Sequence, residues 1–94
     1  MITKRDLIYR QIGAKIRYYR ILKGMTQAEL AQQIHVNLHM LNEIECGKYD
    51  KNLLVTTLLD IADGLRVDVS AFIYFTEQEK WIACEILKND NCEK

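Results

Sequence analysis

Apolar residues recur every three or four positions along most of the chain, and this spacing restricts the possible folds more than any other feature. The stripe that predicts the first helix, of about four turns, consists of Ile8, Ile12, Ile16 and Tyr19. The 94 residues include no proline, and no segment predicts a convincing strand. Because a chain of this length forms one domain, we expect a compact all-α fold of five to six helices.

Two short amphipathic segments follow the first helix, which we expect to stop near Lys23-Gly24. Thr26 and Glu29 have the spacing of a capping box and predict the start of the first short helix. Asn37 is a favourable N-cap for the second, which we expect to end near Gly47. Because only three or four residues join the two, residues 26–45 are predicted to form a helix-turn-helix unit.

Helical signals continue towards the C-terminus. We expect the next helix to close near Gly64, and Asp68 can cap a brief helix after it. A second capping box at Thr76 and Glu79 predicts a terminal helix. We therefore expect a helix-turn-helix domain over residues 1–76, followed at 77–94 by a C-terminal helix and a frayed tail. The apolar positions that define the helix before Gly64 are Leu54, Leu58, Ile61, Ala62 and Leu65.

The charge of the chain is zero overall but unevenly distributed. Residues 1–24 carry seven basic side chains and one acidic side chain, a net charge of +6. Residues 25–94 carry six basic and twelve acidic side chains, a net charge of −6. The basic end allows an approach to a polyanion but is also what a solvated helix face looks like.

Cysteine and histidine spacing argues against a metal site and against a disulfide framework. Cys46, Cys84 and Cys92 are odd in number and widely spaced, which favours a reducing compartment. His35 and His39 are four residues apart, but no third ligand lies near them. We expect a cytoplasmic protein without cofactor or membrane segment. No catalytic constellation is present, so an enzyme is not expected.

The most specific signal is a run of residues at fixed spacing. It comprises Thr26-Gln27-Ala28-Glu29-Leu30-Ala31, then Val36-Asn37, then Leu41, Ile44-Glu45 and Gly47-Lys48. This run resembles the Cro and phage-repressor-like (XRE) helix-turn-helix family, and the resemblance extends from Ile12 to about Phe75. It implies a lambda-repressor-like fold that binds double-stranded DNA, with the second short helix, residues 38–45, in the major groove.

Carried over by position, the resemblance assigns roles to individual residues. The expected base contacts are Leu38, His39, Asn42 and Glu43. The expected phosphate contacts are Thr26, Gln27, Asn37, Lys48, Tyr49 and Lys51. Arg20 and Glu45 match a structural ion pair of the family. Two phosphate assignments have plain structural alternatives: Thr26 as a helix cap, and Lys51 as a solvated loop charge.

The sequence departs from the family pattern in two respects. His35 and Arg66 stand where relatives commonly have glycine, at turns that often need a positive φ. The recognition helix contains no Arg or Lys, although Arg–guanine pairing is the commonest specific base contact. Binding is then expected to depend on phosphate contacts and hence steeply on salt.

The leading hypothesis is a transcriptional regulator that binds a two-fold-related operator as a homodimer. The residues expected to form the dimer contact are Phe75, Trp81, Ile82 and Ile86. A restriction–modification controller and a toxin–antitoxin antitoxin both fit this size. The alternative is a protein-interaction module that keeps the fold but no longer reads DNA, which the neutral charge and the uncharged start of the recognition helix favour.

Overall fold

The computed structural model of the chain describes residues 3–48 and 55–74, and all regular elements in these two ranges are helical. This agrees with the expected all-α class. The expected count of five to six helices included a C-terminal helix at 77–94, which lies outside the described residues. The elements are α1 (Lys4–Leu22), α2 (Gln27–Ile34), α3 (Leu38–Glu45), α4 (Val55–Leu65) and the 3₁₀ helix η1 (Val69–Phe72).

Helix α1 is longer than the four turns predicted, because it begins with a capping box that the apolar stripe does not reveal. The Thr3 hydroxyl accepts a hydrogen bond from the Asp6 amide at 3.1 Å, and the Asp6 carboxylate accepts one from the Thr3 amide at 3.1 Å. The hydrogen bond from the Thr3 backbone holds the pKa of Asp6 below its ordinary value. Satisfying these first amides extends the helix to 19 residues.

All four α-helices end in the same way, with a residue in the left-handed region. The φ angles are 73° at Gly24, 61° at His35, 70° at Gly47 and 58° at Arg66. The amide after each of them donates back to a carbonyl in the last turn, as Val36 does to Ala31 at 3.0 Å. The positive φ expected at His35 and Arg66, where relatives commonly have glycine, is therefore confirmed.

Helix α4 ends at Leu65, one residue beyond Gly64, so the predicted end near Gly64 is confirmed, but Gly64 is not the residue that terminates the helix. Gly64 lies inside the helix, which runs to Leu65, and Arg66 adopts the left-handed conformation. The glycine serves packing instead, since a Cβ at Gly64 would lie 2.7 Å from Cγ2 of Ile34 and 3.1 Å from Cδ1 of Leu30. Close approach of α2 and α4 therefore explains this glycine better than helix termination does.

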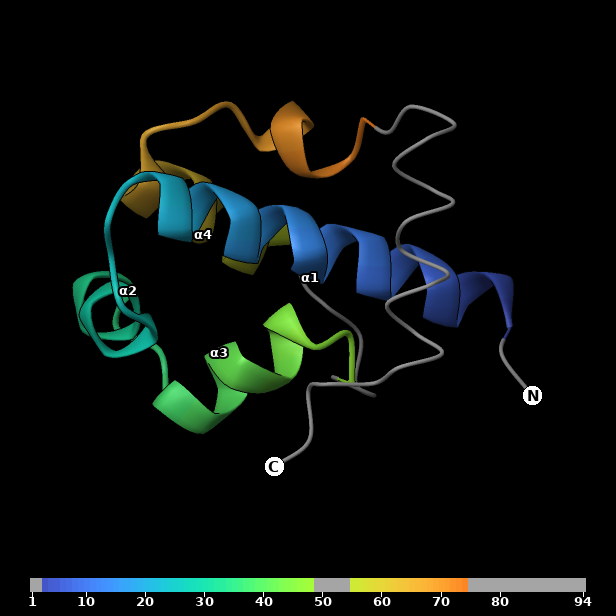
Figure 1. Ribbon diagram of the computed structural model, residues 1–94, viewed down its shortest axis with the longest axis horizontal. Helices are drawn as coiled ribbons and strands as arrows, with labels where there is room; N and C mark the ends of the chain where they lie inside the picture. Colours follow the sequence, from blue (N-terminus) through green and yellow to red (C-terminus); the bar gives the residue numbers. More distant parts are fainter. Residues whose placement is uncertain (1–2, 49–54, 75–94) are drawn as a thin grey trace.

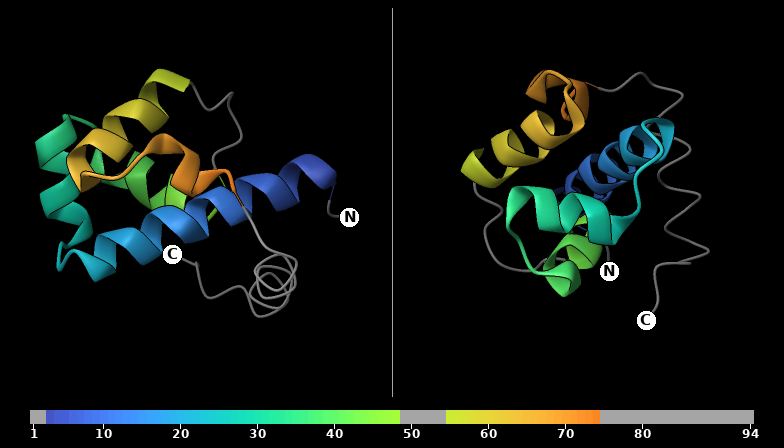
Figure 2. Two further views of the ribbon diagram at one scale, coloured as in Figure 1. Left: turned by 90° about the horizontal axis from the view of Figure 1, so that it is seen from above. Right: turned by 90° about the vertical axis from the view of Figure 1, so that its left-hand side faces the viewer.

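The helices surround α1, which crosses the molecule (Figure 1). Helix α3 packs against α1 and α2, while α4 packs against α2 and α1. The 3₁₀ helix η1 lies on the side of α1 opposite α2 and α3 in that view, and it contacts α1 and α4. Figure 2 shows α2 and α3 together at one end of the molecule. In the turn between them, His35 and Asn37 are exposed.

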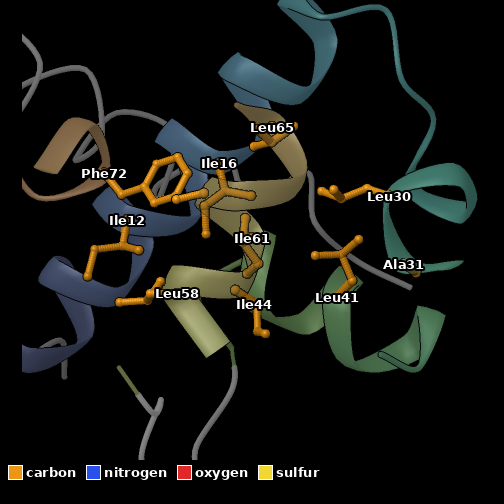
Figure 3. Close-up of a cluster of buried hydrophobic side chains, with 11 residues drawn as sticks. Ile12, Ile16, Leu30, Ala31, Leu41, Ile44, Leu58, Ile61, Leu65 and Phe72 are labelled. Atoms are coloured by element: carbon orange, nitrogen blue, oxygen red, sulfur yellow. The ribbon is translucent and has the colours of Figure 1, made fainter. Parts of the chain in front are cut away.

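The core lies between these helices, and each α-helix contributes to it (Figure 3). The largest side chains with under 2% exposure are Phe72, Ile16, Leu30, Leu41, Ile61 and Leu65. Tyr19 packs on this core, with its ring centroid 6.2 Å from that of Phe72 in an edge-to-face arrangement. The predicted stripe on α1 is wrong at its first position, because Ile8 is 43% exposed. Within the described ranges, no helix is both long and apolar enough to cross a membrane.

Candidate nucleic-acid interface

The candidate interface is built from α2, α3 and the turn between them. The Thr26 hydroxyl accepts from the Glu29 amide at 3.0 Å, and the Glu29 carboxylate accepts from the Thr26 amide at 2.8 Å. The predicted capping box is thus confirmed. Because the cap satisfies the third amide of α2, the amides before it have no partner within the helix and remain suited to an anion.

Asn37 caps α3 as predicted. Its Oδ1 accepts from the amides of His39 at 2.7 Å and Met40 at 3.2 Å. The side-chain oxygen is therefore committed to the helix, and the Nδ2 group is the part of Asn37 that remains to meet a phosphate. The side chain is exposed, as that role requires.

Arg20 and Glu45, the expected ion pair, lie together in the interior. The Arg20 Nε donates to Glu45 Oε2 at 2.7 Å, and a terminal nitrogen donates to Oε1 at 3.1 Å. The other terminal nitrogen donates to the carbonyl oxygen of Met25 at 2.8 Å, in the turn before α2. The side chains are 11% and 1% exposed. One guanidinium thus joins α1 to the end of α3 and to the start of α2.

Gln27, an expected phosphate contact, is part of the same network. Its Nε2 donates to Glu45 Oε1 at 3.0 Å and to Asn42 Oδ1 at 3.3 Å. Sequence reasoning missed this link, because the partners are 18 and 15 residues away and no local signal announces them. The side chains of Arg20, Glu45, Gln27 and Asn42 therefore form one hydrogen-bonded series from α1 to the surface of α3.

The outward face of α3 consists of residues assigned to base contacts. Leu38 is 48% exposed. The His39 Nε2 lies 3.4 Å from Glu43 Oε2, one helical turn further on, and their side chains are 79% and 39% exposed. Asn42 is only half-buried and lies beside α2. The opposite face, with Leu41 and Ile44, is buried in the core.

The remaining predicted contacts lie at or beyond the edge of the described residues. Lys48 follows α3 after Cys46 and Gly47, and it is exposed. Tyr49 and Lys51 lie outside the described residues, as do the four side chains assigned to the dimer contact, which are Phe75, Trp81, Ile82 and Ile86. Among the described residues, no group of three or more His, Cys, Asp or Glu side chains is placed to hold a metal ion.

Comparison with known proteins agrees with this geometry. Residues 16–72 match the helix-turn-helix family. The chain is 35% identical over 60 residues to an uncharacterized helix-turn-helix-type transcriptional regulator of Methanocaldococcus jannaschii, a match that covers 64% of this chain and 89% of that relative.

Two solved structures are similar in fold. One is the clp gene regulator ClgR from C. glutamicum, with a TM-score of 0.67 and 26% identity, covering 81% of this chain and 90% of that one. The other is a point mutant of the restriction-modification controller protein C.Esp1396I, with a TM-score of 0.64 and 28% identity, covering 96% and 100%. The fold is that of helix-turn-helix transcription regulators. The chain belongs to the XRE-type helix-turn-helix family.

Proposed function

We propose that this chain is a sequence-specific DNA-binding transcriptional regulator that places α3 in the major groove of its operator. The observation that carries the proposal is the buried pair of Arg20 and Glu45, extended by Gln27, which fixes α2 and α3 relative to each other. A fixed pair of short helices, one lying across the DNA backbone and the other in the groove, is how helix-turn-helix proteins bind.

The phosphate contacts come from the beginnings of the two short helices and from the residues after α3. Thr26, Gln27 and Asn37 lie at helix starts, where free amides and the helix dipole favour an anion. Lys48 and, beyond the described residues, Lys51 follow α3 in the sequence and supply positive charge, while Tyr49 supplies a hydroxyl group that can donate a hydrogen bond. These contacts position the chain on DNA but carry no sequence information of their own.

Base reading falls to the exposed side of α3. Leu38 offers an apolar surface suited to a thymine methyl group. His39 can donate to guanine, and Glu43 can accept from the amino group of cytosine. Since no arginine takes part, we expect modest discrimination at each base pair and a large share of the affinity from phosphate.

We further propose that the chain acts as a homodimer on a two-fold-related operator. The apolar side chains Phe75, Trp81, Ile82 and Ile86 would form the contact, and the half-sites would lie about one helical turn apart. The likeness in fold to another regulator over nearly the whole of both chains supports the regulator function, whereas the homodimer rests on the apolar character of these four side chains.

The proposal is tested by selection from random-sequence duplex DNA, with affinities measured at several salt concentrations. We expect a palindromic consensus and weaker binding at higher salt. His39→Ala should change the base preference at one position of each half-site, whereas Lys48→Gln should weaken binding to all sequences alike. Gln32→Ala, an exposed change on α2, is the matched control and should alter neither.

The same experiment tests the alternative function. No binding by the wild-type chain, even at low salt, would contradict the DNA-binding proposal. A protein-interaction module that uses the exposed surface of α3 around Leu38 would then be the better explanation.

A further inference from the structure

The last turn of α1 carries a group of exposed apolar side chains. Tyr18, Ile21 and Leu22, here called the α1 face, are 57%, 58% and 63% exposed. Because positions three and four apart lie on the same side of a helix, the three side chains are neighbours. The ring of Tyr18 packs edge to face on that of Tyr19, with 5.1 Å between the ring centroids. Large apolar side chains that gather on a surface in this way indicate an interaction site.

The charges around the α1 face restrict what can bind there. Arg17 and Lys23, which lie beside it in the sequence, are exposed, and α1 has no acidic side chain after Asp6. The α1 helix of a second copy would bring like charges together, which is unfavourable in an interface. An apolar face with basic neighbours instead fits an amphipathic helix that carries acidic side chains.

The sequence of residues 77–87, which lie outside the described residues, has this chemistry. The segment carries three acidic side chains and one basic side chain, a net charge of 1 − 3 = −2. Ile82 and Ile86 are four residues apart and would share one side of the helix that the capping box at Thr76 predicts, with Trp81 next to them. Such a helix would be roughly 16 Å long, which is enough to cover the single turn of the α1 face.

The path of the chain favours a second copy as the source of this segment. After η1 the described chain runs towards the N-terminal half of α1, away from the end that carries the α1 face (Figures 1 and 2). We propose that each protomer of the homodimer places residues 77–87 on the α1 face of the other, so that the two-fold interface contains this contact twice. The inference rests on the proposed homodimer and names the surface that its C-terminal apolar side chains meet.

Trp81 is the only tryptophan of the chain and therefore reports directly on the segment. The first test measures its fluorescence and the sedimentation equilibrium of the full chain over a dilution series without DNA. We expect emission at shorter wavelengths in the dimer, because the contact removes the indole ring from water. The emission should move to longer wavelengths in step with dissociation. Emission that stays constant while the dimer dissociates would overturn the proposal.

A substitution in the α1 face tests the surface itself. Leu22→Glu should weaken dimerisation roughly 100-fold, about tenfold at each of the two contacts, because each contact would bury an unpaired charge. Trp81 should then emit at longer wavelengths at concentrations where the wild type is dimeric. Leu59→Glu is the matched control, since Leu59 lies on α4 and is 47% exposed, and it should change neither property. Circular dichroism checks that both variants fold.

Salt dependence distinguishes the two ways in which a second copy could cover the α1 face, and it needs only the wild-type chain. If the acidic segment binds beside Arg17 and Lys23, dimerisation should weaken as salt screens opposite charges. If two α1 helices meet instead, dimerisation should strengthen as salt screens like charges. Dimerisation that strengthens with salt would therefore overturn the proposed occupant.

Failure of the inference and failure of the proposed homodimer give different results. A wild-type chain that stays monomeric at every concentration contradicts the homodimer, and the inference with it. A wild-type dimer that Leu22→Glu leaves as tight as before contradicts the inference alone, as does a dimer that Leu22→Glu and Leu59→Glu weaken equally.

Discussion

At His35 and Arg66 the backbone adopts φ angles of 61° and 58°, which glycine accommodates more easily than any other residue. The conformation closes α2 and α4, and in each case the next amide, at Val36 and Val67, completes the turn with a hydrogen bond of 3.0 Å. Histidine tolerates the left-handed region better than most residues, but the conformation still has a cost. The turn between the two DNA-binding helices is therefore under some strain.

Replacing His35 with glycine should stabilise the protein. We expect His35→Gly to raise the free energy of unfolding by about 0.5–1 kcal/mol, as relief of backbone strain outweighs the greater freedom of glycine in the unfolded chain. Gly24→Ala is the opposite test: its φ is 73° and nothing lies within 4 Å of an added Cβ. It should cost about 1–2 kcal/mol through the backbone alone. Urea denaturation measures both, and a less stable His35→Gly would contradict the expectation.

Removing one partner of the buried Arg20–Glu45 pair should cause a large and specific loss of stability. Arg20→Met leaves the Glu45 carboxylate, 1% exposed, without its counter-charge, and should cost about 3–5 kcal/mol. Arg17→Met on the exposed side of α1 is the control and should stay within about 0.5 kcal/mol. The double variant Arg20→Met/Glu45→Met should recover much of the loss, because it leaves no buried charge. Equal stability of Arg20→Met and Arg17→Met would contradict this account.

For the helices, prediction from sequence succeeded where the signal is local. The capping box of Thr26 and the N-cap at Asn37 placed the starts of α2 and α3 correctly, because each motif spans only four residues. The role of Gly64 was missed, because this glycine is required by packing against α2 and does not terminate α4. That requirement depends on a neighbour about 30 positions earlier in the chain, which helix signals do not encode.

The approach of α3 to α1 depends on Gly13. A Cβ there would lie within 3.0 Å of the carbonyl oxygens of Ile44 and Glu45, closer than real Cβ atoms come to backbone. Gly13→Ala should therefore displace the end of α3 and cost about 2–3 kcal/mol, although alanine favours helix. Ala14→Gly should lose only about 1 kcal/mol through helix propensity. Thermal unfolding compares the two variants, and a Gly13→Ala variant as stable as the wild type would refute the close packing.

The side chain that caps η1 predicts that the stability of the fold depends on pH under acidic conditions. The Ser70 amide donates to the Asp68 carboxylate at 2.9 Å, and this hydrogen bond lowers the pKa of Asp68 in the folded state. The stabilisation is therefore complete above the ordinary aspartate pKa and is lost as the pH falls through the lowered value. The stability difference between wild type and Asp68→Asn, measured from about pH 6 to about pH 2, should shrink towards acid. A constant difference would mean that the cap does not depend on the charge.

Across the whole molecule, the charge is zero and yet polarised, with +6 on residues 1–24 and −6 on the remainder. The sequence was sufficient to predict the all-helical class and the helix-turn-helix unit, and its resemblance to the family implied the pairing of Arg20 with Glu45. It could not predict that Gln27 joins Glu45 to Asn42, because that link exists only once α2 and α3 have packed together. Local signals therefore predicted the elements, whereas the donor and acceptor pattern on the recognition surface is a tertiary property.

The same polarity means that net charge is a poor guide to DNA binding, and salt dependence is the direct test. We expect the logarithm of the binding constant to fall linearly with the logarithm of salt concentration, by about 0.9 for each phosphate neutralised. Lys48→Gln should reduce this slope by about 1 per protomer while leaving the consensus unchanged. Arg66→Gln, which removes an exposed charge beyond α4, should leave the slope as it is. If both variants changed the slope equally, binding would reflect the overall charge of the chain and not a phosphate contact at the end of the recognition helix.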